Sequence, residues 1–386
     1  MKRKLFKKEI GSKKKPDYVL VSVITALILL GLVILVSVSA SLSHEKYGSP
    51  NFYLFHHILY GLLPGAILGF AAYKLPFSFL RKWSPLFLLV SLVLMVLVFI
   101  PGLGMKVGGA SRWLSLGPIS SIQPSEFLKI SFLLYLSAWL AARTERKKEE
   151  SFSKKPVVFS ETFAAFLAIM GLVSVLLVLQ PDVSTLGIIV ICAAIMYFLA
   201  GTPIKHSLIV FLSGIAGLAV LIKLAPYRFN RFLAFIRSDI DPMGISYQIK
   251  QALIAVGSGG IFGTGLGISV QKYGFLPQPM ADSIFAVFCE EAGFAGGLVL
   301  ISLFLIFAWR GFKIAKNTSD KFCKLVSLGI TSWIVLQAFV NMGSMVGLMP
   351  LTGIPLPFVS YGGSAIIAEL IGVGILFNIS KETKTI

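Results

Sequence analysis

The chain has few of the residues that build disulfide frameworks and zinc sites. Its 386 residues include only three cysteines and four histidines. The cysteines Cys192, Cys289 and Cys323 fall within or beside apolar stretches and have no metal-ligand spacing, and the histidines form no HExxH pattern. The sequence therefore argues against a disulfide scaffold and against a zinc enzyme.

Charged residues are also scarce. They make up 13% of the chain, whereas hydrophobic residues make up 56%, which is outside the balance of soluble domains. A spanning helix needs about 20 apolar residues, and stretches of this kind lie at 18–40, 53–73, 84–101, 124–142, 161–179, 183–200, 204–224, 283–309, 322–349 and 357–380. We expect an all-α integral membrane protein, a single polytopic bundle of about ten transmembrane helices with a long extracytoplasmic loop between helices 7 and 8.

Acidic residues are outnumbered by basic ones, 17 to 35, for a net charge of +18. In a soluble chain this charge would suggest a nucleic-acid partner. With the N-terminus inside, however, 25 of the 35 basic residues fall on one side of the membrane, which is the positive-inside pattern. We therefore expect cytoplasmic tails at 1–17 and 381–386, a membrane domain over 18–380, and no nucleic-acid partner.

The long outer loop, residues 226–281, is the expected working surface, because long loops without a function are uncommon. Residues 245–256 carry apolar side chains at helical spacing, typical of an interfacial amphipathic helix. The glycine-rich run 257–267 follows. No strand precedes it and no GK[ST] motif follows it, so we expect a close-packed turn or a re-entrant segment and not a nucleotide-binding loop.

Polar groups at membrane depth are functional candidates because the bilayer excludes them. Glu126 and Lys129 lie one helical turn apart, so they form either a structural ion pair or a substrate contact. Arg112, beside Trp113, offers a guanidinium to a phosphate or anchors the chain at the interface. Asp182 follows Gln180-Pro181 and is expected to cap the sixth span.

Two more groups stand at the outer face. Arg228 and Arg231 open the long loop against the positive-inside rule, which indicates attraction to a phosphorylated ligand or to anionic lipid. Asp282 follows two prolines and begins the eighth span. Its carboxylate either caps that helix or faces the outer water layer at the mouth of the bundle.

Six strings of the sequence carry a resemblance to a known family. They are GASRWLSLG at 109–117, QPSEFLK at 123–129, QPDVSTLG at 180–187, YRFNR at 227–231, DPMGISYQ at 241–248 and GLMPLTGIPLPFVSYGGSA at 347–365. With these strings the chain resembles the SEDS (shape, elongation, division and sporulation) polymerases over nearly all ten spans. Asp241-Pro242 and Tyr247-Gln248 favour the FtsW-like division branch over the RodA-like elongation branch.

The resemblance implies a peptidoglycan glycosyltransferase that polymerises lipid II, an undecaprenyl-pyrophosphate disaccharide-pentapeptide, at the outer face of the bacterial cytoplasmic membrane. It also implies a class B penicillin-binding transpeptidase and other divisome proteins as partners. The family's essential aspartate maps to Asp282, which would act as the base on the acceptor hydroxyl. Met280-Ala281 stand where His-Thr is usual and Ser283 where Phe is common, so the carboxylate is kept but its neighbours differ.

Substrate binding is assigned to residues that precede this aspartate in the sequence. Cations facing the leaving pyrophosphate would lower the barrier, and a divalent cation such as Mg²⁺ could share this task, although the sequence shows no dedicated metal cage. The expected substrate-binding residues are Arg112, Glu126, Lys129, Arg228, Arg231, Gln248 and Lys272.

Two functions of other classes stay open. A lipid II flippase would place Glu126, Lys129, Glu290 and Glu369 along its path, but the absence of an internal repeat counts against it. A non-catalytic scaffold would recruit its partner through a GxxxGxxxG face at Gly61, Gly65 and Gly69, a pattern more often used for packing within one chain.

Overall fold

The computed structural model describes residues 15–383, apart from 108–109, 116, 118–120, 151–158, 202–203, 225–228, 230–232, 234 and 236–243. Within this part of the chain the helices are α1 (Tyr18–Tyr47), α2 (Phe52–His57), η1 (Ile58–Leu62), α3 (Leu63–Lys74), α4 (Phe77–Leu97), α5 (Pro124–Glu150), α6 (Phe159–Leu179), α7 (Val183–Leu199), α8 (Ile204–Leu224), α10 (Ile245–Ser258), α11 (Ile284–Asn317), α12 (Lys321–Met345) and α13 (Gly363–Ser380). Each predicted span corresponds to one helix, or to the unit α2–η1–α3 for 53–73. The amphipathic helix expected at 245–256 is α10.

The helices carry an apolar outer surface. Seven of them, in the described part of the chain, are long and apolar enough to cross a membrane. Large apolar side chains such as Leu29, Phe70 and Leu89 are exposed on the outside of the bundle, where acyl chains would cover them. The chain is a multi-pass membrane protein, and the predicted all-α class is confirmed.

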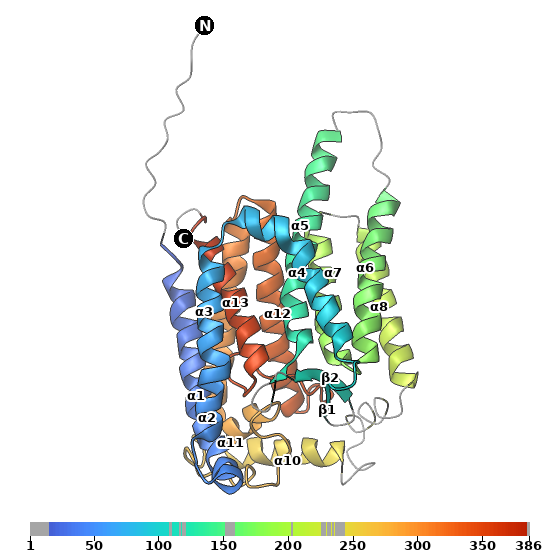
Figure 1. Cartoon of the computed structure of the whole chain (residues 1–386). Helices are drawn as coiled ribbons and strands as arrows, with labels where there is room; N and C mark the ends of the chain where they lie inside the picture. The colour runs from blue at the N-terminus through green and yellow to red at the C-terminus, as the bar shows by residue number, and fades with distance from the viewer. Residues whose placement is uncertain are drawn as a thin grey trace.

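The two ends of the bundle differ. Figure 1 shows that α1 begins and α13 ends at one end, whereas α10 and a small sheet lie at the other. The sheet has the antiparallel order β1 (Gly104–Val107), β2 (Ala110–Ser115), β3 (Ser121–Ile122). These strands are an addition to the expected all-α fold. Strands of two to six residues leave little alternation in a sequence.

Glycines allow α3 and α13 to approach closely. A Cβ at Gly69 would lie 2.6 Å from the carbonyl oxygen of Leu370, and one at Gly374 would lie 2.0 Å from the carbonyl oxygen of Gly69. Gly61 and Gly65 face the same helix through Gly363 and Ile367. The GxxxGxxxG face is therefore used for packing within the chain.

The glycine-rich run packs against a break in α11. Gly293 has φ +69° and ψ −169°, which interrupts the helix. The amide of Thr264 donates to the carbonyl of Glu290 over 2.9 Å, and the amide of Phe294 donates to the carbonyl of Gly260 over the same distance. A Cβ at Gly263 would lie 2.1 Å from the Glu291 carbonyl oxygen. This run is the close-packed turn expected from the sequence.

Candidate active site

A cavity of about 540 Å³ lies where the sheet, the first turns of two helices and two long connections meet. Sheet strand β2 contributes Arg112 and Trp113, α5 contributes Glu126, and the turn before α7 contributes Asp182. Ala281 and Asp282, which precede α11, complete one wall, and the segment 349–355 with Tyr361 completes another. The cavity thus collects residues from five separate parts of the chain.

Asp282 lies in this cavity wall and does not cap α11. The N-cap position belongs to Ser283, whose side chain makes no capping bond and instead donates to the carbonyl of Pro277 over 2.8 Å. Gln248 of α10 donates its amide to Asp282 Oδ2 over 3.4 Å and to Ser283 Oγ over 3.1 Å. The carboxylate is half-buried and lines the cavity, so of the two sequence alternatives the structure favours the one that faces an opening.

Two amides of α12 hold the connections around Asp282. Asn341 donates to the carbonyl oxygens of Asp282 and Ile354, over 2.8 Å in each case. One helical turn earlier, Gln337 donates to the carbonyl of Pro355 over 3.0 Å. Buried amides that satisfy loop carbonyls fix the loop backbone, because losing such a bond leaves a buried polar group unpaired. These bonds position Asp282 against the 349–355 segment.

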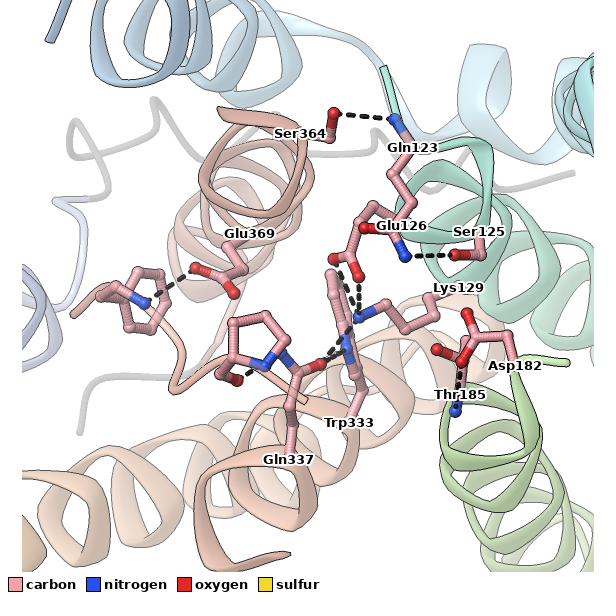
Figure 2. A network of polar contacts seen from close by, with 12 residues as sticks. Gln123, Ser125, Glu126, Lys129, Asp182, Thr185, Trp333, Gln337, Ser364 and Glu369 are labelled. Atoms are coloured by element: carbon pink, nitrogen blue, oxygen red, sulfur yellow. Dashed lines mark hydrogen bonds and ion pairs between the residues drawn. The ribbon is translucent and has the colours of Figure 1, made fainter. Parts of the chain in front are cut away.

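Glu126 and Lys129 form a buried ion pair, shown in Figure 2, with the Lys129 ammonium 2.9 Å from Glu126 Oε2. The same ammonium donates to Gln337 Oε1 over 2.7 Å and lies 5.0 Å from the centre of the Trp333 ring. Glu126 lines the cavity, whereas Lys129 is not among the lining residues. Lys129 therefore fixes the orientation of Glu126 from behind the cavity wall.

Arg112 is tied to the turn that precedes α7. Its Nε donates to the carbonyl of Gln180 over 3.0 Å and its Nη2 donates to the carbonyl of Pro181. Gln180 in turn donates to the carbonyl of Met95 over 2.7 Å. Arg112 lines the cavity, and backbone carbonyls fix the position of its guanidinium.

Asp182 caps α7, as the sequence predicted. Its Oδ1 accepts the amide of Thr185 over 3.3 Å. The side chain is buried and lines the cavity. Two residues later, the Ser184 hydroxyl donates to the carbonyl of Thr352, in the 349–355 segment, over 2.7 Å. Only one of the two carboxylate oxygens of Asp182 is therefore used to cap the helix.

Lys272, another expected site residue, is not among the residues that line this cavity. Lys272 is buried, pairs with Glu291 over 2.8 Å and donates to Ser37 over 3.2 Å. This pair ties the glycine-rich region to α1 and α11. Arg228 and Arg231 lie outside the described residues.

The same chain matches a known protein family over almost its whole length. The family model for FtsW, RodA and SpoVE, described as cell cycle protein, matches residues 18–385. The chain belongs to this family.

The relatives cover almost the whole chain. Stage V sporulation protein E of Bacillus subtilis (strain 168) is 38% identical over 373 residues, which are 96% of this chain and 99% of the relative. The probable peptidoglycan glycosyltransferase FtsW of Nitrosococcus halophilus (strain Nc4) is 35% identical over 380 residues, 97% of this chain and 94% of the relative.

Solved structures of the family share the fold. A chain of a peptidoglycan synthase complex, studied for the structural coordination of polymerization and crosslinking, matches with a TM-score of 0.73 and 27% identity, over 95% of this chain and 97% of that one. The rod shape determining protein RodA of Thermus thermophilus matches with a TM-score of 0.69 and 26% identity, over 96% and 98%.

The sequence left open a divalent cation such as Mg²⁺, and the described residues offer no cage made of protein ligands alone. Among those residues, no group of three or more His, Cys, Asp and Glu side chains could hold a metal ion. Mg²⁺ is commonly held by one or two carboxylates together with substrate phosphates. Asp282 and Glu126 are the carboxylates, besides the helix cap Asp182, that face the cavity for such a role.

Sequence reasoning missed Asn341 and Tyr361. Tyr361 lines the cavity, its hydroxyl is hydrogen-bonded to His56 Nδ1 over 2.8 Å, and its amide donates to the carbonyl of Met280 over 2.9 Å. Burial raises the pKa of Tyr361 to about 12, with further contributions from Tyr53 and Tyr47, so the phenol stays protonated at neutral pH. Asn341 is a polar residue inside an apolar span, so the principle that polar groups at membrane depth are functional candidates could have identified it.

Proposed function

We propose that this protein is a peptidoglycan glycosyltransferase that polymerises lipid II, with the 540 Å³ cavity as its active site. The observation that carries the proposal is the Asp282 carboxylate in the wall of a cavity that also presents the Arg112 guanidinium. Family membership supports it, since relatives bear the name peptidoglycan glycosyltransferase FtsW. The same names support a division role, while the sporulation relative supports the shared chemistry.

The proposed reaction is an inverting glycosyl transfer between two lipid II molecules. The 4-hydroxyl oxygen of the acceptor sugar forms a bond to the anomeric carbon of the donor, and the bond from that carbon to the pyrophosphate breaks. Asp282 takes the proton of the attacking hydroxyl, a task that contributes about 10²-fold to 10⁴-fold in rate when the base is well placed. Arg112 faces the negative charge that collects on the leaving pyrophosphate.

The remaining cavity residues serve as supports in this proposal. Glu126, held by Lys129, accepts hydrogen bonds from sugar hydroxyls, and Gln248 orients the Asp282 carboxylate. The cavity end of the bundle faces the outside of the cytoplasmic membrane, and both termini face the cytoplasm. This placement follows from the excess of basic residues at the other end.

We also propose a crosslinking partner, a class B penicillin-binding transpeptidase, within a division complex. The similarity to a chain of a peptidoglycan synthase complex supports this. Glycan strands must be crosslinked to bear mechanical load. A complex of the two enzymes would place the transpeptidase where the polymerase releases its strands.

The test is polymerisation of purified lipid II by the protein reconstituted with its transpeptidase partner. We expect glycan strands from the wild type and at least a 100-fold lower rate from Asp282→Asn at an unchanged melting temperature. Asp320→Asn is the matched control, because Asp320 caps α12 through Cys323 and is not a cavity residue. Full activity of Asp282→Asn would remove the base assignment. Transfer of labelled lipid II from one leaflet of a vesicle membrane to the other, without polymerisation, would favour a flippase.

A further inference from the structure

One oxygen of Asp182 has no partner in the part of the chain that the structure describes. The side chain is 6% exposed, and its Oδ1 is used to cap α7. Its Oδ2 is buried and accepts no hydrogen bond from the described residues, and Figure 2 draws a single dashed line from this carboxylate, to Thr185. Leaving a charged acceptor buried and unpaired costs more than leaving a neutral one. Because the residue lines the cavity, a ligand there could supply the missing donor.

A hydroxyl on the neighbouring 349–355 segment has the same property. Thr352 Oγ1 is buried without a hydrogen-bond partner among the described residues, and Thr352 lines the same cavity. The Ser184 hydroxyl donates to the Thr352 carbonyl over 2.7 Å, so the first turn of α7 and the 349–355 segment are in direct contact. The two walls thus offer a carboxylate acceptor and a hydroxyl, which both donates and accepts.

We infer that Asp182 and Thr352 form a sugar subsite, in which a hydroxyl of the carbohydrate donates to Asp182 and accepts from Thr352. This inference rests on the proposed function for the identity of the sugar, a disaccharide unit of lipid II. A sugar hydroxyl is donor and acceptor together, so it has the chemistry that the Asp182 oxygen and the Thr352 hydroxyl both lack. The subsite is separate from the base, because Asp282 stands on the connection before α11 and is held by α10 and α12.

The local structure makes this subsite testable without unfolding the helix. Asn and Asp are equally good N-caps, so Asp182→Asn keeps the bond to Thr185 while it replaces the free carboxylate oxygen with an amide donor. Asp320→Asn makes the identical change at another helix cap, where the side chain accepts the amide of Cys323 over 2.8 Å. Any loss of stability from the exchange itself will appear in both variants.

The experiment measures the polymerisation rate against lipid II concentration for the wild type, Asp182→Asn and Asp320→Asn. We expect Asp182→Asn to raise the half-saturating concentration by about 10-fold to 100-fold, the effect of losing a hydrogen bond to a charged group. The rate at saturation and the melting temperature should match those of Asp320→Asn. Thr352→Val should raise the half-saturating concentration by about 5-fold, and Thr352→Ser should restore it.

Other outcomes separate the subsite from the reaction. An unchanged half-saturating concentration in Asp182→Asn would overturn the subsite and leave the polymerase standing. A shift in the Mg²⁺ requirement alone would assign Asp182 to a cation and also overturn it. If the wild type does not polymerise lipid II, the proposed function fails. Lipid II binding, measured by the shift in melting temperature, then tests the subsite independently. Weaker binding by Asp182→Asn supports the subsite, and equal or absent binding overturns it.

Discussion

The side-chain amide of Gln248 lies 3.4 Å from Asp282 Oδ2 and 3.1 Å from Ser283 Oγ. Helix α10 therefore reaches the connection that carries the candidate base. We predict that Gln248→Leu lowers the polymerisation rate about 10-fold, because the carboxylate loses a donor that orients it. Melting temperature and lipid II half-saturation should change little. Lys250→Ala, an exposed position on the same helix, is the control, and a wild-type rate in Gln248→Leu would contradict the orienting role.

Arg112 is expected to act on the leaving group and on the turn that holds Asp182. Arg112→Ala should lower the rate at limiting lipid II by about 100-fold, because the charge facing the pyrophosphate is lost. Arg112→Lys keeps the charge but cannot reproduce the two bonds to Gln180 and Pro181, so its rate should fall between those of Arg112→Ala and the wild type. A rate for Arg112→Ala equal to the wild type at limiting substrate would exclude the phosphate role.

The buried pair of Glu126 and Lys129 gives a stability prediction. Lys129→Met leaves Glu126 charged and unpaired, which should lower the free energy of unfolding by about 3–5 kcal/mol. In Glu126→Gln/Lys129→Met the uncompensated charge is gone, and we expect most of this loss to be recovered. Thermal unfolding in detergent measures both, with the exposed Lys324→Met as control. Equal melting temperatures for the single and double variants would show that the pair is not coupled.

Packing of α3 on α13 gives a second stability prediction with its own control. In Gly69→Ala the new methyl group would meet the Leu370 carbonyl at 2.6 Å, so the two helices must separate and the melting temperature should fall. A methyl group added at Gly171, in α6, would meet nothing within 4 Å among the described residues. Gly171→Ala should therefore leave stability equal or raise it by about 0.5–1 kcal/mol. A fall of equal size in both variants would argue against the close helix contact.

The membrane spans could be predicted well because a run of about 20 apolar residues is a strong and local signal. The sixth span, expected at 183–200, is α7 at Val183–Leu199. The capping role of Asp182 was equally local, since it depends only on the amide of Thr185 three residues later. Strand β2 was missed because its pairing partners, and not its own composition, define it.

The site was harder to predict because its parts are distant in the sequence. Lys272 was expected at the substrate, but it pairs with Glu291, 19 residues away and on another element. The unpaired oxygen of Asp182 acquires meaning only when the 349–355 segment is packed against α7. Motif resemblance located Asp282, yet only the folded chain shows that Gln248 and Asn341 hold it.

The two amides on α12 have a mechanical consequence. Gln337 contacts the Lys129 ammonium and the Pro355 carbonyl, and Asn341 contacts the Asp282 and Ile354 carbonyls. Sliding α12 along its axis would therefore displace the Lys129–Glu126 pair and the backbone of Asp282 together. Any displacement of this helix would thus change the cavity from a distance, without contact to the substrate.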